Sequence, residues 1–204
     1  MLGLDQAKTD WRSRYQQQVA YREQSASQDA SRYARAYRLF VYAFGARYMS
    51  LAFEAGGLDA LRAQFASPPL TSHALLASAE GVYVPEFAAS EPPAPVPPEL
   101  WSEVTRETLG AWGVFLALAR LTSVAEAHEL ALGWRGDAAW VYAATGVVER
   151  TAVVWKLELA DEALAARVAT LAFAIAPDVV RAGTRVMLAD AAGGTAALDW
   201  AFVE

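Results

Sequence analysis

The chain has 204 residues, of which 55% are hydrophobic and 20% are charged; this composition supports a packed core and excludes the intrinsically disordered class. It contains no cysteine, which excludes disulfides and thiolate metal sites but leaves the cellular compartment open. The net charge of −6 argues against a nucleic-acid-binding protein, because such proteins need a basic surface.

The first 50 residues are basic although the whole chain is acidic. They contain eight basic and four acidic side chains, a net charge of +4 that leaves −10 for the remainder. Residues 4–25 are predicted to form a helix, because their few apolar side chains recur every three or four positions. These side chains are Leu4, Ala7, Trp11, Tyr15 and Val19. A solvated helix face attracted to the acidic remainder explains the basic charge, and binding to an acidic protein surface is the alternative.

A second helix is predicted from 28 to 55, and it is apolar on so many sides that it belongs inside a domain. Gly56-Gly57 ends it, because glycine accepts the left-handed turn of a helix C-terminus. A short helix follows at 58–65, and Pro68-Pro69 then forces an extended backbone. A brief strand is predicted at 81–87.

Five prolines between residues 88 and 98 predict a stiff linker. The sequence is therefore divided into a helical region, 1–87, the linker, 88–98, and a second region, 99–204. Whether these regions pack into one compact unit is left open by the sequence.

Beyond the linker the pattern is first helical and then that of strands. A helix is predicted from 99 to 121, and a second one is capped by Ser123 and ended by Gly133. The apolar period then changes from 3.6 to 2, which predicts strands at 138–145, 150–159, 179–189 and 195–203. A helix at 162–175, with Asp161 at its start, separates the second strand from the third.

Turns are predicted at Asp178 and at 190–194, the latter as a hairpin loop. The sequence thus predicts an α+β fold, in which an N-terminal helical region is followed by a small, mostly antiparallel β-β-α-β-β sheet module with a helix on one face.

A self-contained catalytic or metal site is not found in the sequence. The zinc helix of a gluzincin peptidase needs two histidines four positions apart and a glutamate beside the first. The chain has two histidines, His73 and His128, and Leu132 stands where the partner of His128 would be. Neither a Gly-x-Ser-x-Gly elbow nor a phosphate-binding loop occurs. We therefore expect no enzyme activity, no metal and no cofactor for this chain alone.

The segment from Gly133 to Asp137 has two interpretations. In the first, it is a tight turn in which Trp134 fills the core and Asp137 accepts hydrogen bonds from backbone amides. In the second, it is a recognition loop that offers Trp134, Arg135 and Asp137 to a ligand. The first interpretation is favoured, because large aromatic residues between glycines more often pack than bind.

Several short strings, in order, carry a resemblance to a known family. They are Tyr42-x-x-Gly45-x-x-Tyr48, Gly56-Gly57, Pro68-Pro69-x-Thr71-Ser72, Glu107-Thr108-Leu109-Gly110, Gly133-Trp-x-Gly-Asp137 and Val153-Val-Trp155. Over roughly residues 36–190 the chain resembles the C-terminal half of a family of bacterial zinc metallopeptidases of the gluzincin type. Many members of that family are exported or lipid-anchored.

The resemblance implies that the catalytic half is missing here. In the family, the His-Glu-x-x-His helix precedes the matched region, whereas residues 1–35 contain no histidine. Two further positions depart from the family pattern: His73 stands where an acidic residue is usual, and Leu157-Glu158 replaces a Trp-Asp pair. The resemblance therefore implies an accessory half without its peptidase half.

We accordingly predict a non-catalytic protein-interaction or accessory domain. The alternative is a subunit or fragment of a zinc metallopeptidase whose His-Glu-x-x-His half lies on a separate or missing segment. A protein partner or a second copy of the chain is expected to bind through the N-terminal helices, residues 4–38, unless the first helix folds back to cover the body. The candidate binding residues are Trp11, Tyr15, Tyr21, Arg22, Tyr33, Trp134, Arg135 and Asp137.

Neither nucleic acid nor a transmembrane segment is expected. The first residues lack the basic and then apolar order of a signal peptide. The compartment is therefore expected to be cytoplasmic by default, or extracytoplasmic if the chain is cut from a longer precursor.

Overall fold

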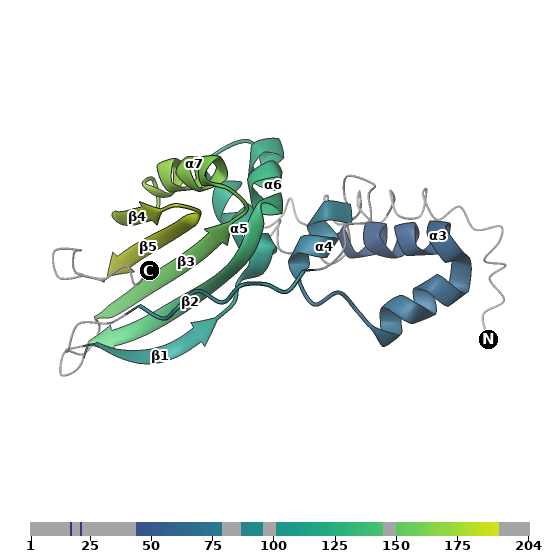
Figure 1. Ribbon diagram of the computed structural model, residues 1–204, viewed down its shortest axis with the longest axis horizontal. Coiled ribbons are helices and arrows are strands. Elements are labelled where there is room, and N and C mark those ends of the chain that lie inside the picture. The colour runs from purple at the N-terminus through teal and green to yellow at the C-terminus, as the bar shows by residue number, and fades with distance from the viewer. Residues whose placement is uncertain are drawn as a thin grey trace. The chain divides into compact units, whose positions relative to one another are not determined.

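The computed structural model describes residues 17, 21, 44–78, 87–95, 101–144 and 150–191. The chain divides into two compact units (Figure 1). The first comprises Met1–Leu70 and Ala74–Glu86, and the second comprises Thr71–His73 and Phe87–Glu204.

The first unit contains helix α3, Gly45–Ala66, which is bent at its two central glycines. Gly56 and Gly57 have non-helical backbone angles, and the φ of Gly57 is +63°, in the left-handed region that favours glycine. The hydroxyl of Tyr48 donates a hydrogen bond of 2.5 Å to Gln64 Oε1 and so joins the two halves of the helix. The predicted helix end at these glycines is confirmed. Helix α4, Ser72–Ala77, follows.

The second unit is built on a five-stranded antiparallel sheet in the order β1-β2-β3-β5-β4. The strands are β1, Trp101–Glu107; β2, Trp134–Ala144; β3, Thr151–Leu159; β4, Asp178–Ala182; and β5, Arg185–Ala191. Three helices accompany them: α5, Gly110–Leu118; α6, Val124–Leu132; and α7, Glu162–Ala172. The predicted α+β class, with helices first and a mostly antiparallel sheet after them, is confirmed.

Two of the predicted helix starts are confirmed by their hydrogen bonds. The Ser123 hydroxyl accepts a bond from the amide of Glu126 at the start of α6, and the Asp161 carboxylate accepts one from the amide of Leu164 at the start of α7. Both caps satisfy amides that have no partner inside the helix.

The predicted helix at 99–121 is wrong over its first part, where strand β1 is found. Trp101–Glu107 pairs with β2 and is exposed at every residue after the first. An edge strand that is exposed on both faces has no apolar period of 2, so its sequence does not distinguish it from a helix surface. A register shift between Glu103 and Thr105 further interrupts the alternation.

The predicted single strand at 179–189 is also wrong, because two strands lie there. β4 and β5 form a hairpin in which Ala182 pairs with Arg185 across the two residues Gly183 and Thr184. The φ of Gly183 is +56°, which a two-residue hairpin turn requires. The strand predicted at 195–203 lies outside the described residues, and so does the strand predicted at 81–87 except for Phe87, which is not in a strand. The hairpin loop predicted at 190–194 is wrong at residues 190 and 191, which belong to β5, and its other residues lie outside the described ranges.

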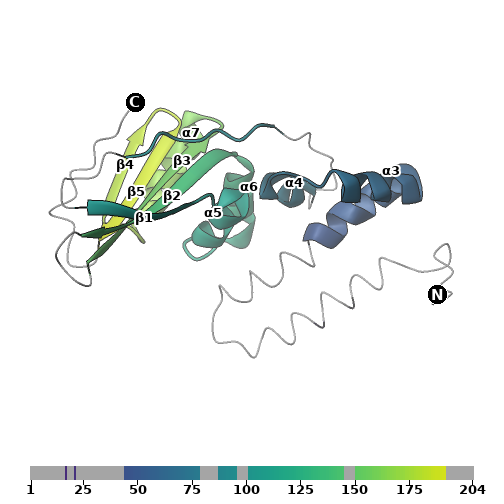
Figure 2. The ribbon, with the colours of Figure 1, turned by 90° about the horizontal axis from the view of Figure 1, so that it is seen from below.

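The two faces of the sheet are covered differently. On the helix-side face, Trp155, Leu157 and Leu188 line a cleft together with residues of α5 and α7. Figures 1 and 2 show these helices gathered at the end of the sheet where β2 begins. The opposite face carries a buried cluster: Ala138, Trp140, Tyr142, Ala152, Val154, Met187, Ala189 and Ala191. The alternation along β2 therefore supplies two apolar surfaces.

The described part of the predicted linker is bonded to the sheet (Figure 2). Within residues 87–95, the amide of Ser90 donates to Arg135 O at 2.8 Å, and Ser90 forms a parallel bridge with Gly136. Glu91 forms an ion pair with Arg106 of β1. We call residues 87–95 the proline-rich segment. It belongs to the second unit, and at Gly136 its backbone approaches β2 so closely that an added Cβ atom would lie 2.0 Å from Ser90 O.

Candidate functional site

The centre of the second unit is the carboxylate of Asp137, which is 1% exposed. Its Oδ2 accepts hydrogen bonds from the amide of Leu109 and from Trp155 Nε1, both at 2.9 Å. Its Oδ1 accepts bonds from the amide of Gly110 at 2.8 Å and from Trp134 Nε1 at 2.9 Å. We call these five residues the Asp137 cluster. Four N–H donors stabilise the buried charge in place of water.

The Asp137 cluster caps helix α5 from a distance. The side chain of Leu109, which precedes the helix, cannot cap it, and Gly110 has a φ of +70°. The Asp137 carboxylate bonds the first two amides, and the Ser72 hydroxyl accepts a bond of 3.0 Å from the amide of Trp112. A negative charge at a helix N-terminus is also favoured by the helix dipole. The carboxylate thus fixes α5 onto the sheet.

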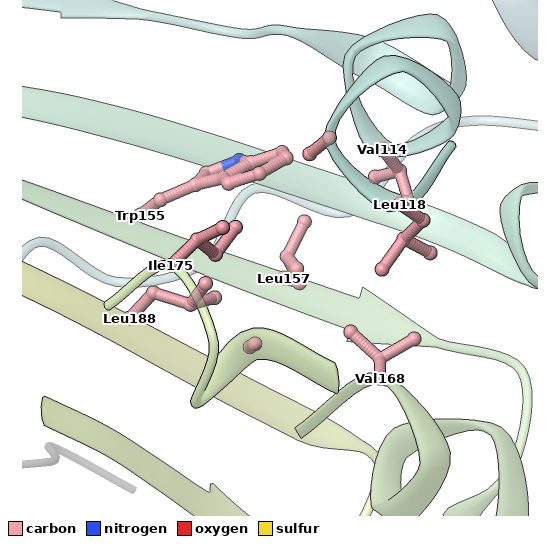
Figure 3. Close-up of a pocket in the computed structure, with 9 residues that line it drawn as sticks. Val114, Leu118, Trp155, Leu157, Val168, Ile175 and Leu188 are labelled. Atoms are coloured by element: carbon pink, nitrogen blue, oxygen red, sulfur yellow. The ribbon is translucent and has the colours of Figure 1, made fainter. Parts of the chain in front are cut away.

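The same carboxylate fixes Trp155, whose ring borders an apolar cleft (Figure 3). The cleft is lined by Val114, Ala117, Leu118, Trp155, Leu157, Val168, Ala172, Ile175 and Leu188. Its volume of about 10 Å³ has room for at most one water molecule. Figure 3 shows Ile175 beside the indole of Trp155, with Val168 at the opposite end. The cleft is therefore too small to take up a side chain, and Ile175 is the exposed residue of its lining.

Exposed apolar side chains continue from this cleft across the sheet. Ile175 is 42% exposed and Val153 is 45% exposed. Val153 lies on the same face as Trp155, two residues away, and it is paired with the half-buried Val141. We call Val141, Val153, Trp155 and Ile175 the apolar patch. Its one polar atom, the indole nitrogen of Trp155, is already bonded to Asp137.

A second buried polar group, His73, lies at the start of β2, beside the same Trp134 that bonds Asp137. Its Nε2 donates a hydrogen bond of 2.9 Å to Leu132 O, and its ring contacts those of Phe87 and Trp134. Burial lowers the pKa of His73 below its ordinary value; the Leu132 bond opposes this shift, and the charge of Arg135 adds to it. The folded protein therefore holds this imidazole neutral at pH values where an exposed histidine is charged.

The lowered pKa of His73 predicts a loss of stability in mild acid. Between the folded pKa and the ordinary value of about 6.5, the unfolded chain binds a proton that the folded chain does not. The contribution of His73 to the free energy of unfolding is therefore largest above that range. It decreases as the pH falls through the range, by at most about 1.4 kcal/mol per pH unit for one proton. Urea unfolding should show that the free energy of unfolding decreases more between pH 7.5 and pH 5.5 for the wild type than for His73→Gln. Equal declines would contradict the prediction.

On the opposite face, Lys156 is 4% exposed and donates a hydrogen bond of 2.9 Å to the carbonyl of Pro93. Burial, with a smaller contribution from the charge of Arg185, lowers the pKa of Lys156. The bond connects β3 to the proline-rich segment. It gives the ammonium an acceptor in a place that water does not reach.

Comparison with known proteins places the larger part of the second unit in a family. Residues 98–200 match the model of a domain of unknown function, DUF8575. The chain belongs to this family. No curated protein and no solved structure matches the chain. The DUF8575 region contains all five strands, the Asp137 cluster and the apolar patch, whereas His73 and the proline-rich segment precede it.

Membership in DUF8575 states no activity, and the resemblance to metallopeptidases stays a prediction. Among the described residues, no three histidine, cysteine, aspartate or glutamate side chains lie close enough to hold a metal ion. None of the helices in those same ranges is long and apolar enough to cross a membrane.

The structure brings together three of the sequence-predicted site residues. Trp134 and Asp137 are each 1% exposed, and Asp137 accepts bonds from backbone amides, as the first interpretation of the segment expects. The tight turn of that interpretation is wrong, because Trp134–Asp137 is the start of strand β2 and pairs with β3. Arg135 is half-buried, with its guanidinium 4.9 Å from the centre of the Phe87 ring. Tyr21 is 65% exposed. The other candidates, Trp11, Tyr15, Arg22 and Tyr33, lie outside the described residues.

The sequence reasoning missed the apolar patch of the DUF8575 domain. Val153 and Trp155 alternate as in any half-buried strand, and Ile175 follows an amphipathic helix. One sequence signal could have indicated the patch: the strands carry more apolar side chains than three short helices can cover. Sequence periodicity alone does not say which of these side chains stay exposed.

Proposed function

We propose that this protein is a non-catalytic protein-interaction domain and that the apolar patch is its contact surface. The observation that supports this proposal most is the fixed position of Trp155. Its indole nitrogen is bonded to the buried Asp137, while its ring borders a cleft whose rim is exposed and apolar. A partner would rest an aliphatic or aromatic side chain on this rim.

A fixed tryptophan favours binding because less conformational entropy is lost when the partner arrives. Ordering one flexible side chain at an interface costs about 0.5–1.5 kcal/mol, and a side chain that is already ordered avoids this cost. Tryptophan is also among the residues that contribute most to binding energy at protein interfaces. The Asp137 cluster would thus serve the function indirectly, by holding Trp155 in place.

The chemistry of the cleft supports binding rather than catalysis. Its lining side chains offer neither a nucleophile nor an acid or base, since the lining is aliphatic apart from Trp155. The Asp137 carboxylate lies behind that tryptophan and is saturated by four donors. An apolar group is therefore what this surface can receive.

The N-terminal helices are a second proposed surface, for a protein partner or for a second copy of the chain. Tyr21, with 65% of its surface exposed, is the described aromatic that supports it. The net charge of +4 over residues 1–50 would favour an acidic partner surface.

Photo-crosslinking in the cells that produce the protein tests these proposals. With a benzophenone amino acid in place of Ile175, we expect a discrete covalent adduct with a partner protein. The matched control is Val180, which is 41% exposed and lies on β4 beside Met187 of the opposite face. Equal yields of adduct at positions 175 and 180, or no adduct at either position, would contradict the proposal that the apolar patch is the contact surface. The same label at Tyr21 tests the N-terminal surface.

A further inference from the structure

Helices cover only part of the helix-side face of the sheet. The row Ala139, Trp155 and Leu188 borders α5 and α7, whereas the next row is exposed at every position except the half-buried Val141. The open row consists of Thr105, Val141, Val153 and Asp190, paired across β1, β2, β3 and β5. Beyond it, Ala143 pairs with the exposed Thr151. In Figure 1 the corresponding ends of β2 and β3 extend away from the helices.

The open part of the face has room for one helix. Its side chains are small or branched at Cβ, so they leave a low floor, while Ile175 and Trp155 stand at its border with the helices. Four strands at a spacing of about 4.8 Å span about 14 Å, and a helix with its side chains is about 10–12 Å wide. Helices α5 and α7 already pack on the covered part of the same face. A further helix would continue that layer.

The charges beside this floor have one sign. Glu107 is paired with Ala139 on one side, and Asp190 is paired with Val153 on the other. Both carboxylates are exposed. The described helix-facing positions of the open part include no lysine and no arginine; they are Ser102, Thr105, Val141, Ala143, Thr151, Val153 and Asp190. The pair of Glu107 and Ala139 lies in the bordering row. An apolar floor between two carboxylates is complementary to an apolar stripe with basic side chains on both sides.

We infer that this open part of the sheet binds an amphipathic helix of a partner protein, with lysine or arginine residues flanking the apolar stripe of that helix. The inference rests on the proposed function and specifies its partner. Addition of a strand at the edge of the sheet is less well supported, because β1 has a register shift near its middle and carries three charged side chains. The helix would place apolar residues at i, i+3, i+4 and i+7 against Val141, Val153 and Ile175.

Two synthetic peptides of about 18 residues, five helical turns, test the inference with the full-length protein. Both carry the same leucine stripe; one has lysine on its flanks and the other has glutamate. Calorimetric titration should show at least about tenfold tighter binding of the lysine peptide at low salt, with the difference shrinking as salt screens the charges. Glu107→Gln together with Asp190→Asn should remove this difference.

A matched pair of variants locates the binding site. Val153→Lys should weaken binding of the lysine peptide by at least about tenfold, because it removes an apolar contact and adds a like charge. Val180→Lys introduces the same charge at a valine of similar exposure on the opposite face and should leave binding unchanged. Equal affinity for the two peptides, no binding of either, or equal effects of the two variants would overturn the inference.

The outcomes separate this inference from the proposed function. If Ile175 crosslinks a partner but mass spectrometry maps the adduct to a strand or loop of that partner, the interaction domain stands and the helical partner is wrong. If position 175 gives no more adduct than position 180, both the proposed contact surface and the helical partner are wrong.

Discussion

Asp137→Asn is expected to destabilise the protein by about 3–5 kcal/mol, a large part of the 5–15 kcal/mol that stabilises a typical domain. The asparagine amide has one acceptor oxygen, and its NH₂ group faces two of the four N–H donors that the carboxylate now satisfies. These donors would stay buried without acceptors, which costs about 1–3 kcal/mol each. Urea denaturation followed by tryptophan fluorescence measures the change.

Asp161→Asn is the matched control for this experiment. Asp161 is exposed and accepts a single amide bond at the start of α7. Asparagine caps helices about as well as aspartate, so the expected change is within about 0.5 kcal/mol. A stability of Asp137→Asn within 1 kcal/mol of the wild type would show that the Asp137 cluster does not hold the second unit together.

Gly136→Ala is expected to detach the proline-rich segment and to cost about 2–4 kcal/mol. A Cβ atom at this position would lie 2.0 Å from Ser90 O and 2.2 Å from Ser90 Oγ, so the segment would have to move away from β2. Its displacement would also remove the Pro93 carbonyl from the buried ammonium of Lys156. Urea unfolding measures the loss of stability, and limited proteolysis should reveal new cleavage within residues 87–95.

Two further variants distinguish this clash from other effects. At Gly45, the first residue of α3, an added Cβ atom meets nothing within 4 Å, so Gly45→Ala should be neutral or slightly stabilising. Ser90→Gly should not rescue Gly136→Ala, because the nearest obstacle is the main-chain oxygen of Ser90. Wild-type stability of Gly136→Ala, without new cleavage, would show that this close approach is not needed.

The parts of the fold that could be predicted depend on local chemistry. Ser123 and Asp161 cap the helices that immediately follow them, and Gly57 bends α3 through its own backbone. Strand β3 and the part of β2 from Ala138 onward could be predicted, whereas the first four residues of β2 were expected to form a turn or a loop. Each of these signals lies within a few residues of the feature that it determines.

The parts that could not be predicted depend on contacts distant in sequence. Strand β1 exists because it pairs with β2, although its own residues are mostly exposed and polar. Asp137 was expected to bond backbone amides, but its partners Leu109 and Trp155 lie 28 and 18 residues away. The identity of these partners depends on how the helices fold onto the sheet.

The candidate site was the least predictable feature for the same reason. An apolar side chain such as Val153 has the same sequence pattern whether or not a helix covers it. Its exposure follows from the short lengths of α5 and α7 and from their position at one end of the sheet. The aromatic residues of the N-terminal segment gave a clearer sequence signal for binding, and that signal stays a prediction.

The central claim is that a partner protein makes contact beside Trp155. It is tested most directly by comparing, in living cells, the crosslinks formed from a photoreactive side chain at position 175 with those formed from position 180. We expect one predominant partner to be captured at position 175 and lost when Val153 is replaced by lysine. Capture that is insensitive to that replacement, or equally frequent at both positions, would contradict the account.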